Sequence, residues 1–215
     1  MIADYPGEVI LAVDTSLGTA LALIDDDGTR LSDASAADPL GHAEVIGDLL
    51  VRAISGTGRG EIGHVVAGMG PGPFTGLRIG IAAARAFALG RGIPVIPVPS
   101  HLAAALTAIE RDAVSGPFAI VTDARRREVA VTVFDGTDAD GIPLVTVDTR
   151  LVPSADADEH LGGVRRIDVA TLSAVDLARV GARAVAAGRT LAGDEPLYLR
   201  HPDVTVPGAP KKVGR

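Results

Sequence analysis

The sequence is poor in the side chains that carry redox chemistry and soft-metal binding. It contains no cysteine and no tryptophan, and aromatic residues make up only 3% of its 215 residues. The absence of cysteine excludes disulfides, a thiol nucleophile, and zinc or iron–sulfur sites with cysteine ligands. Because hydrophobic residues still make up 47% of the chain, its core must be built mainly from aliphatic side chains.

Long apolar runs are also missing. No stretch has the length and continuous apolarity of a membrane helix, and the start, MIADYPGEVI, lacks the charged and apolar regions of a secretory signal peptide. We therefore expect no membrane association and a cytoplasmic location. The formal net charge is -7, so the chain as a whole repels nucleic acid phosphates, and we expect any contact with RNA to depend on a partner.

The order of apolar runs predicts an α/β protein with mixed sheets and helices packed on them. Predicted strands lie at residues 9–13, 19–24, 29–35, 65–69, 93–98, 118–122, 129–134 and 144–152. The first predicted helix begins at Pro39 or Gly41 and ends at residue 54, and the others lie at residues 76–90, 101–111 and 174–187. Thr75, Ser100 and Ser173 are the predicted helix N-caps. A change of pattern between Pro99 and Pro117 divides the chain into domains at residues 1–105 and 106–215, and the second ends in a loose basic tail at residues 207–215.

The stretch VVAGMGPGPFTGLRIGIAAARAFALG, residues 65–90, is typical of a buried strand, a tight loop and a helix. Small residues recur at every fourth position of the helix and predict a face that another backbone can approach closely: Gly76, Gly80, Ala84 and Ala88. The loop and helix N-terminus could bind a phosphate or another anion, with Arg78 nearby. We favour a tight turn before a closely packed helix, because the spacing matches neither a P-loop nor a dinucleotide fingerprint.

The helix at residues 41–54 has an apolar stripe wider than one core contact requires. Val45, Ile46, Leu49 and Leu50 belong to it, so a second face is available to another helix or another protein. No second histidine lies three or four residues from His42 to complete a metal-binding pair. For this histidine we favour a polar or packing role over that of a metal ligand.

A charged turn, Asp123-Ala124-Arg125-Arg126-Arg127-Glu128, separates two predicted strands. The arginine run could contact phosphate. We favour a solvated hairpin tip, because acidic residues flank the arginines on both sides.

Four motifs in this order make the chain resemble the TsaB (YeaZ) family. They are ILAVDTS at residues 10–16, GPGPFTGLRIG at residues 70–80, DARR at residues 123–126 and PLYLR at residues 196–200. The second motif is a specific signal, and together the motifs span the chain from end to end. The sequence departs from the family pattern at Arg127, where many members have glycine, and at Ala130, where many have tyrosine.

The resemblance implies an actin-like (ASKHA, ribonuclease H-like) fold with two related lobes. It also implies a non-catalytic subunit, without a metal or cofactor of its own, that binds the catalytic paralogue TsaD together with TsaE. That complex transfers threonylcarbamoyl to the adenosine next to the anticodon of tRNAs that read codons starting with A. Contact with tRNA would be indirect, ATP and Mg²⁺ would act only at the level of the complex, and the isolated chain would form a homodimer.

The resemblance also assigns roles to residues. The first two helices would form the surface for TsaD or a second copy of the chain, through His42, Val45, Ile46, Leu49, Leu50, Gly76, Ile79, Gly80, Ala83 and Phe87. Asp14, Thr15, Ser16 and Asp123 would be remnants of a nucleotide phosphate site. TsaD holds its metal through paired histidines on the first helix, and this sequence offers only His42 there.

Two enzymatic functions compete with the scaffold hypothesis. An ATP-dependent phosphotransferase of the same fold would use Asp14 to organise Mg²⁺ and the loop at residues 70–75 to approach phosphate. Against it, the second half of the chain has no clear glycine-rich loop for adenosine. A metallopeptidase has less support still, because the second histidine of a metal pair is missing.

Overall fold

The protein is built from two β-sheets and five α-helices within residues 8–36, 41–55 and 61–200, which the computed structural model describes. The strands are β1 (Val9–Asp14), β2 (Thr19–Ile24), β3 (Arg30–Ala36), β4 (Ile62–Gly68), β5 (Val95–Val98), β6 (Pro117–Asp123), β7 (Glu128–Thr137), β8 (Pro143–Pro153) and β9 (Arg165–Asp168). The helices are α1 (His42–Ile54), α2 (Phe74–Arg91), α3 (Ser100–Glu110), α4 (Ala157–Leu161) and α5 (Ala174–Ala186), and a 3₁₀ turn, η1 (Ser154–Asp156), precedes α4.

The two sheets share one strand order. The first runs β3-β2-β1-β4-β5 and the second β8-β7-β6-β9. In each sheet, three strands that are consecutive in the chain pair antiparallel: β1, β2 and β3 in the first sheet, and β6, β7 and β8 in the second. The first strand of each set, β1 or β6, also pairs parallel with a later strand, β4 or β9. The repeat confirms the predicted α/β class with mixed sheets and two related lobes.

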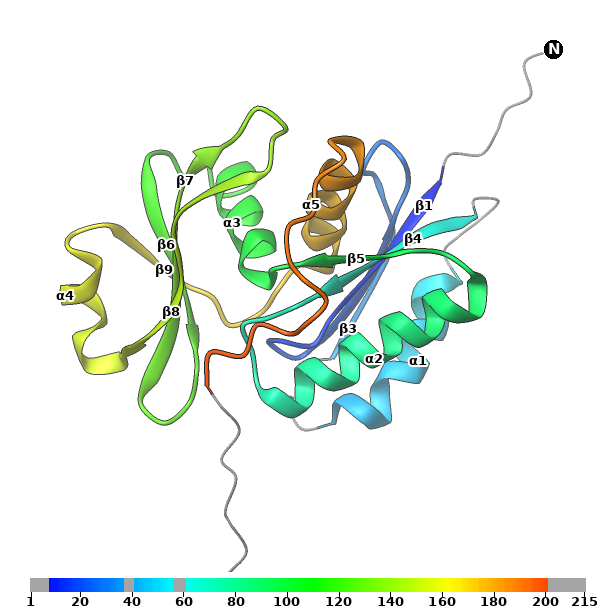
Figure 1. Ribbon diagram of the computed structural model, residues 1–215, viewed down its shortest axis with the longest axis horizontal. Helices are drawn as coiled ribbons and strands as arrows, with labels where there is room; N and C mark the ends of the chain where they lie inside the picture. The colour runs from blue at the N-terminus through cyan, green and yellow to red at the C-terminus, as the bar shows by residue number, and fades with distance from the viewer. Residues whose placement is uncertain (1–7, 37–40, 56–60, 201–215) are drawn as a thin grey trace, which may run out of the picture.

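Both faces of the first sheet are buried, because helices cover each of them (Figure 1). Along β1, Leu11 and Val13 point to the side of α1 and α2, whereas Ile10 and Ala12 point to the side of α3 and α5. This alternation follows from the period of two in a strand. It explains why β1 and β2 are apolar throughout rather than at every second residue.

The helices α3 and α5 form the layer between the two sheets (Figure 1). Phe118 and Phe134 of the second sheet join the same core, with their ring centroids 5.7 Å apart. Helix α5 packs mainly on β1 and β2, although it comes late in the chain, and α3 spans residues 105 and 106. The predicted domain boundary between these two residues stays a prediction.

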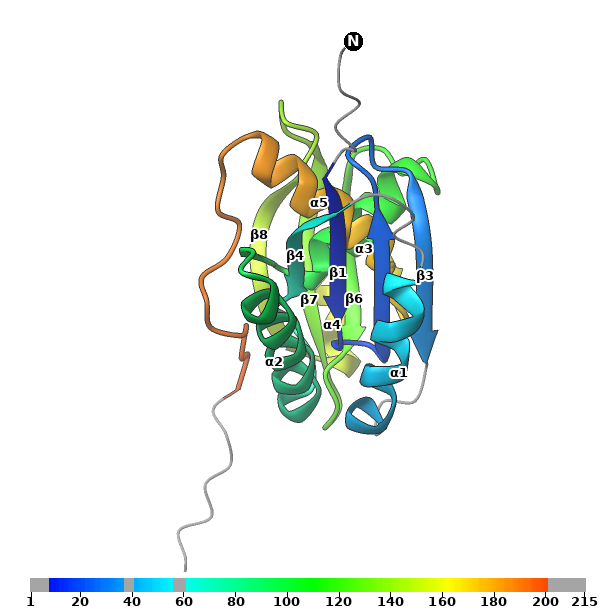
Figure 2. The same ribbon diagram turned by 90° about the vertical axis from the view of Figure 1, so that its right-hand side faces the viewer.

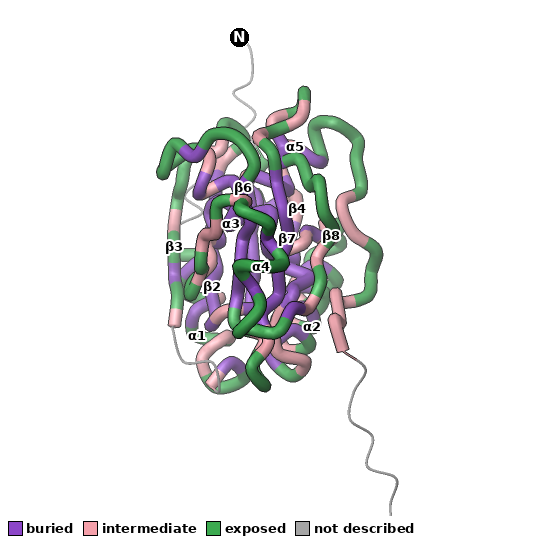
Figure 3. The backbone as a smooth tube through the Cα atoms, turned by 90° about the vertical axis from the view of Figure 1, so that its left-hand side faces the viewer, coloured by how far each residue is buried: buried purple, intermediate pink, exposed green. Residues whose placement is uncertain are grey.

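The outer face of the second sheet packs against α4. Figure 3 views the molecule from this side, with α4 in front of the buried strands β6 and β7. Ala157 and Leu161 of α4 fill a small aliphatic core there. The sequence did not predict α4, because residues 155–163 are acidic and show no apolar pattern. It did not predict β9 either, because its sequence, RRID, is polar.

Two of the three predicted N-caps are wrong. Helix α2 begins at Phe74 after Pro73, whose φ of -60° suits the residue before a helix, so Thr75 lies inside the first turn. Ser100 is the first residue of α3 rather than its cap, and its hydroxyl group bonds elsewhere. The prediction for Ser173 is confirmed, since its hydroxyl oxygen accepts a hydrogen bond from Asp176 N at 3.1 Å.

The predicted tail at residues 207–215 lies outside the described residues. In the part of the chain that is described, no helix combines the length and apolarity needed to cross a membrane.

Candidate functional site

Asp14 lies at the end of β1, and its carboxylate is enclosed by the chain. Its side chain is buried, with 2% of the residue exposed. One carboxylate oxygen accepts hydrogen bonds from Ser16 N at 2.7 Å and Ser16 Oγ at 2.5 Å, and the other accepts one from Ser100 Oγ at 2.5 Å. Burial raises the pKa of Asp14, although the hydrogen bonds from Ser100 and Ser16 and the nearby His42 oppose this.

Backbone packs closely around this carboxylate. A Cβ on Gly68 would lie 1.8 Å from Asp14 Oδ2, and a Cβ on Gly72 would lie 2.7 Å from Ser16 Cα. Ser100 Oγ also accepts a hydrogen bond from Gly70 N at 3.0 Å. Both carboxylate oxygens of Asp14 are therefore engaged by hydroxyl and N–H groups of the chain itself.

The small residues Gly76 and Gly80 of α2 face Thr15 in the β1–β2 loop. Thr15 Oγ1 donates a hydrogen bond to the carbonyl oxygen of Gly76 at 2.8 Å, and a Cβ on Gly80 would lie 2.1 Å from Thr15 Oγ1. Ala84 and Ala88 are buried on the same side. The small residues therefore let α2 approach the β1–β2 loop closely.

His42 is the first residue of α1 and is 3% exposed. Its Nδ1 lies 2.7 Å from Thr19 Oγ1, whereas its Nε2 is buried without a hydrogen-bond partner. A Cβ on Gly76 would lie 2.9 Å from this Nε2. One nitrogen of the imidazole is thus anchored, and the other is adjacent to the first turn of α2.

The tip of the β6–β7 hairpin has an unusual backbone conformation. Arg125, Arg126 and Arg127 have φ values of 60°, 56° and 62°, in the left-handed region that costs non-glycine residues roughly 1–2 kcal/mol each. Arg200 holds the tip, donating to the carbonyl oxygens of Ala124 and Arg125 and pairing with the carboxylate of Glu128. Asp123 and the three arginines are exposed, which confirms the predicted solvated hairpin tip, and Arg200 braces its backbone.

A C-terminal segment, residues 191–200, carries Arg200 to this tip. Along the way, the hydroxyl group of Tyr198 accepts a hydrogen bond from Arg78 Nε at 2.9 Å, and the Tyr198 ring packs on that of Phe74 at 4.7 Å. Leu197 N donates to the carbonyl oxygen of Met69 at 2.8 Å. Figures 1 and 2 show the segment running beside α2 before it reaches the second sheet.

Two clefts separate the first lobe from the hairpin tip. The larger has a volume of about 740 Å³, between the N-terminus of α2, the hairpin tip and the C-terminal segment. The smaller, about 430 Å³, is lined by Ser16, Asp123 and Asp168 among others. His42, Asp123 and Arg125 line both, whereas Asp14 lines neither. The structure therefore brings Asp123 to the cleft walls and separates Asp14 from both clefts.

The residues predicted to form a partner surface fall into two groups. His42, Leu49, Gly76 and Gly80 are buried inside the chain, where they position α1 and α2 and are not available as surface. The others are half-buried: Val45, Ile46, Leu50, Ile79, Ala83 and Phe87. On the same two helices, Val51 is 61% exposed and Leu89 84%.

Helices α1 and α2 lie side by side on the outer face of the first sheet (Figure 2). We call the exposed and half-buried apolar residues of α1 and α2 the two-helix surface. Large apolar side chains exposed on neighbouring helices are a feature of protein interfaces.

Several contacts of the site could not be found from the sequence. Ser100 contacts Asp14 across 86 residues, and Arg200 contacts Glu128 across 72. The PLYLR motif signalled that residues 196–200 matter, but not that they brace the hairpin tip. Among the described residues, no three His, Asp or Glu side chains are grouped to hold a metal ion.

The chain is similar in sequence to several known proteins. A family model described as TsaD, tRNA N6-adenosine threonylcarbamoyltransferase, matches residues 40–145. The Mycobacterium tuberculosis protein Rv3421c is 33% identical over 207 residues, which cover 90% of this chain and 92% of that protein. The tRNA threonylcarbamoyladenosine biosynthesis protein TsaB of Escherichia coli is 28% identical over 220 residues, covering 89% of this chain and 94% of TsaB.

Two solved structures share the fold. A Pseudomonas aeruginosa protein described as similar to peptidase YeaZ superposes with a TM-score of 0.75 at 22% identity, covering 90% of this chain and all of its own. YeaZ from Pseudomonas aeruginosa gives a TM-score of 0.73, also at 22% identity, with 89% of this chain covered. Both matches extend over the two lobes and support the predicted actin-like fold.

Proposed function

The chain belongs to the TsaB (YeaZ) family and has its actin-like fold, and from this premise we propose that it acts in tRNA threonylcarbamoyladenosine biosynthesis as a non-catalytic subunit. In this proposal it binds TsaD, together with TsaE, and supports the transfer of threonylcarbamoyl to tRNA by TsaD. It contacts tRNA only through the complex.

The two-helix surface is the observation that carries the proposal. Val51 and Leu89 expose 61% and 84% of their surface, and the half-buried Ile46, Ile79 and Phe87 lie on the same two helices. Burying apolar area gains about 25 cal/mol per Å², so leaving it in water favours association. A pair of adjacent helices suits a partner that contributes helices of its own, because ridges and grooves can interdigitate.

The state of Asp14 supports a non-catalytic role. In a phosphotransferase of this fold its carboxylate would have to help organise Mg²⁺ near the transferred phosphate. Here both carboxylate oxygens already accept hydrogen bonds, from Ser16 and Ser100, and the side chain is buried. Binding a metal ion would therefore compete with these hydrogen bonds and with the burial of the side chain.

A charged side chain in the two-helix surface tests the proposal. Ala83→Glu and Ile79→Glu place a carboxylate where an apolar contact is expected, and desolvating it would cost several kcal/mol. We expect neither variant to co-purify with TsaD or to support tRNA modification. Leu144→Asp is the matched control, since it charges an exposed apolar residue of β8, on the second sheet. Retention of binding and activity by both helix variants would contradict the proposed surface.

Calorimetry with Mg-ATP separates this proposal from the phosphotransferase alternative. The isolated chain is expected not to hydrolyse ATP or transfer its γ-phosphate. Turnover by the isolated chain would favour the enzyme.

A further inference from the structure

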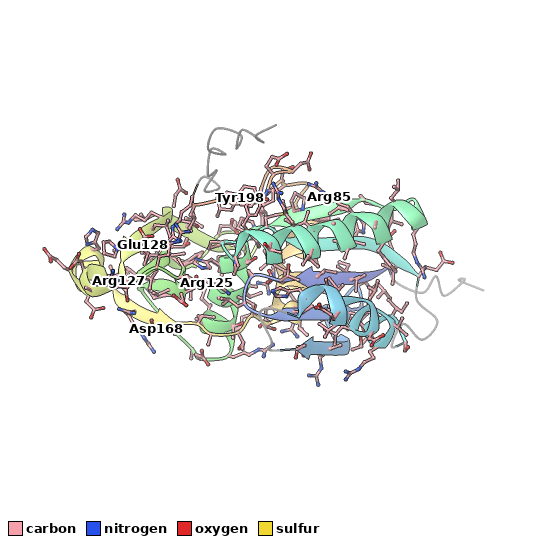
Figure 4. The ribbon with its side chains drawn as sticks, turned by 90° about the horizontal axis from the view of Figure 1, so that it is seen from below. Arg85, Arg125, Arg127, Glu128, Asp168 and Tyr198 are labelled. Carbon is pink, nitrogen blue, oxygen red and sulfur yellow. The ribbon has the colours of Figure 1, made fainter. Side chains whose placement is uncertain are left out.

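The β7–β8 turn, residues 138–142, lies on the side of the molecule away from the clefts. Strand β7 begins at Glu128, and Figure 4 shows Glu128 at the hairpin tip with Arg125 and Arg127. Because β7 has 10 residues, roughly 30 Å separate the hairpin tip from the β7–β8 turn. Figure 1 shows this turn next to α3 and α5. A contact made here therefore acts on the second sheet at the end opposite the clefts.

The β7–β8 turn is held together by its own hydrogen bonds. Asp138 N donates to the carbonyl oxygen of Ile142 at 2.9 Å, and Gly141 N donates to that of Asp138 at 3.0 Å. The Asp138 carboxylate accepts from the backbone N–H groups of Asp140 and Ile142, both at 3.0 Å. The side chain of Ile142 is buried in the core that α3 and α5 share with both sheets. Contacts with this turn are thus transmitted to both β7 and β8.

Arg183 of α5 connects the first lobe to this turn. Helix α5 packs mainly on β1 and β2 of the first sheet. The guanidinium of Arg183 donates through Nη1 to the carbonyl oxygen of Gly141 at 2.6 Å, and through Nη2 to the carboxylate of Glu110 at 2.5 Å. Glu110 is the last residue of α3. One side chain thus joins α5, α3 and the second sheet.

Arg189, three residues after α5, adds a second connection. Its backbone N–H donates to the carbonyl oxygen of Ala184 at 2.8 Å, which fixes it to the end of the helix. Its guanidinium pairs with the carboxylates of Asp138 and Asp140, the latter at 2.8 Å. Arg183 and Arg189 therefore both reach from the first lobe to the same turn of the second.

Deeper in the layer between the sheets, α3 and α5 are joined more firmly. The side chain of Asp176 on α5 is 1% exposed and accepts hydrogen bonds from Thr107 Oγ1 at 2.6 Å and Arg111 Nη2 at 3.0 Å, both on α3. Separating a buried carboxylate from its partners is costly. The side chains of Arg183 and Arg189 are 30% and 41% exposed, and exposed ion pairs contribute little singly. The two helices are thus held at their centre, and the contacts with the turn are weaker.

We propose that Arg183 and Arg189 form a latch that fixes the angle between the two lobes. Arg200 holds the second sheet at the hairpin tip, and the latch holds it at the other end of β7. Release of the latch lets the second sheet tilt on the α3–α5 layer and changes the width of the clefts. The proposal concerns the isolated chain and does not depend on TsaD binding.

The distance between two spin labels, one in each lobe, tests the latch. The natural chain has no cysteine, so Ser35→Cys on β3 and Glu159→Cys on α4, both at exposed positions, give two specific labels. Pulsed electron paramagnetic resonance measures the distance in labelled chain diluted with an excess of unlabelled chain, so that each distance lies within one copy. We expect one narrow distribution with the latch intact, and a broader, shifted distribution in Arg183→Ala/Arg189→Ala.

Arg179→Ala is the matched control, since it removes an arginine of the same helix that does not contact the turn. Arg179 donates to the carbonyl oxygen of Gly28 at 3.0 Å and to Asp176 at 3.1 Å, both in the first lobe. This variant should keep the narrow distribution.

A second double variant removes acceptors of the latch and leaves α5 unchanged. Glu110→Gln/Asp140→Asn should broaden the distribution in the same direction as the arginine variant, and circular dichroism would verify that each variant folds. A distribution identical to that of the natural chain in either double variant, or the same broadening in Arg179→Ala, would overturn the proposal.

Discussion

At the scale of single residues, glycine sets how closely α2 approaches the first hairpin. A Cβ on Gly80 would lie 2.1 Å from Oγ1 and 2.8 Å from Cγ2 of Thr15, whose hydroxyl is already bonded to Gly76. We predict that Gly80→Ala lowers the free energy of unfolding by about 2 kcal/mol, because overpacking outweighs the gain in helix propensity. Urea unfolding measures the change.

Gly47 of α1 provides the control for this prediction. No atom lies within 4 Å of a Cβ built on Gly47, so Gly47→Ala should be neutral or stabilise the fold by up to about 1 kcal/mol. Similar stability changes in the two variants would show that close approach at Gly80 is not required.

His101 makes the stability of the fold depend on pH. It lies between Thr132 and Thr122, 2.7 Å and 3.0 Å away, and burial lowers its pKa from 6.5 to about 3. The unfolded chain therefore takes up a proton below about pH 6.5 that the folded chain refuses until about pH 3, so stability falls as the pH is lowered through this window. The loss from pH 7 to pH 5 is on the order of 2 kcal/mol.

Unfolding of the natural chain and of His101→Asn at pH 7 and pH 5 would measure this contribution. Asp14 acts in the opposite sense, because its raised pKa makes the folded chain bind a proton more readily than the unfolded chain. Since Asp14 is present in both proteins, the difference between their pH dependences isolates His101. Identical pH dependences would contradict the prediction.

At the scale of elements, the C-terminal segment ties the β6–β7 hairpin to the first lobe. Arg200 donates to two carbonyl oxygens of the tip and pairs with Glu128. We predict that Arg200→Ala speeds hydrogen exchange at the amides of Ala124 and Glu128 roughly tenfold, because a strained left-handed turn loses its brace.

Arg189→Ala is the control for exchange at the hairpin tip. Arg189 pairs with Asp138 and Asp140 at a different turn, so its removal should leave the amides of the tip unaffected. If exchange at the tip were the same in the Arg200 and Arg189 variants, the turn would not need Arg200.

The elements with strong apolar patterns could be predicted from the sequence. Strands β1 and β2 and helix α5 follow from their patterning, and their predicted bounds lie within one residue of the observed ones. Strand β9 could not be found this way, because in RRID parallel pairing with β6 overrides a weak local preference. Helix α4 has only five residues, too few for a helical period to appear.

Only those features of the candidate site that depend on a single segment of the chain could be predicted from the sequence. The small-residue face of α2 follows from small residues at every fourth position, but the contact of this face with Thr15 depends on how two distant segments pack. The Asp14–Ser100 and Arg200–Glu128 contacts likewise need the folded chain. The three arginines have positive φ values, which residues other than glycine rarely adopt, so the sequence gives no local signal for this left-handed conformation.

At the scale of the whole molecule, the two-helix surface predicts self-association when TsaD is absent. Exposed Val51 and Leu89 and the half-buried residues around them would be covered by a second copy. We predict a dimer by light scattering at micromolar concentration, and a shift to monomer in Ala83→Glu. Leu144→Asp is the control, because Leu144 lies on the second sheet, and this variant should remain dimeric. If the natural chain were strictly monomeric, the prediction would be wrong.

Reconstituted tRNA modification tests the central claim most directly. Purified TsaD and TsaE, supplied with threonylcarbamoyl adenylate as the donor, would be assayed for threonylcarbamoyl transfer to tRNA, with and without this chain. A non-catalytic subunit should be required for full activity with TsaD present and should have no activity when TsaD is omitted. Full modification without the chain, or modification by the chain in the absence of TsaD, would contradict the proposed function.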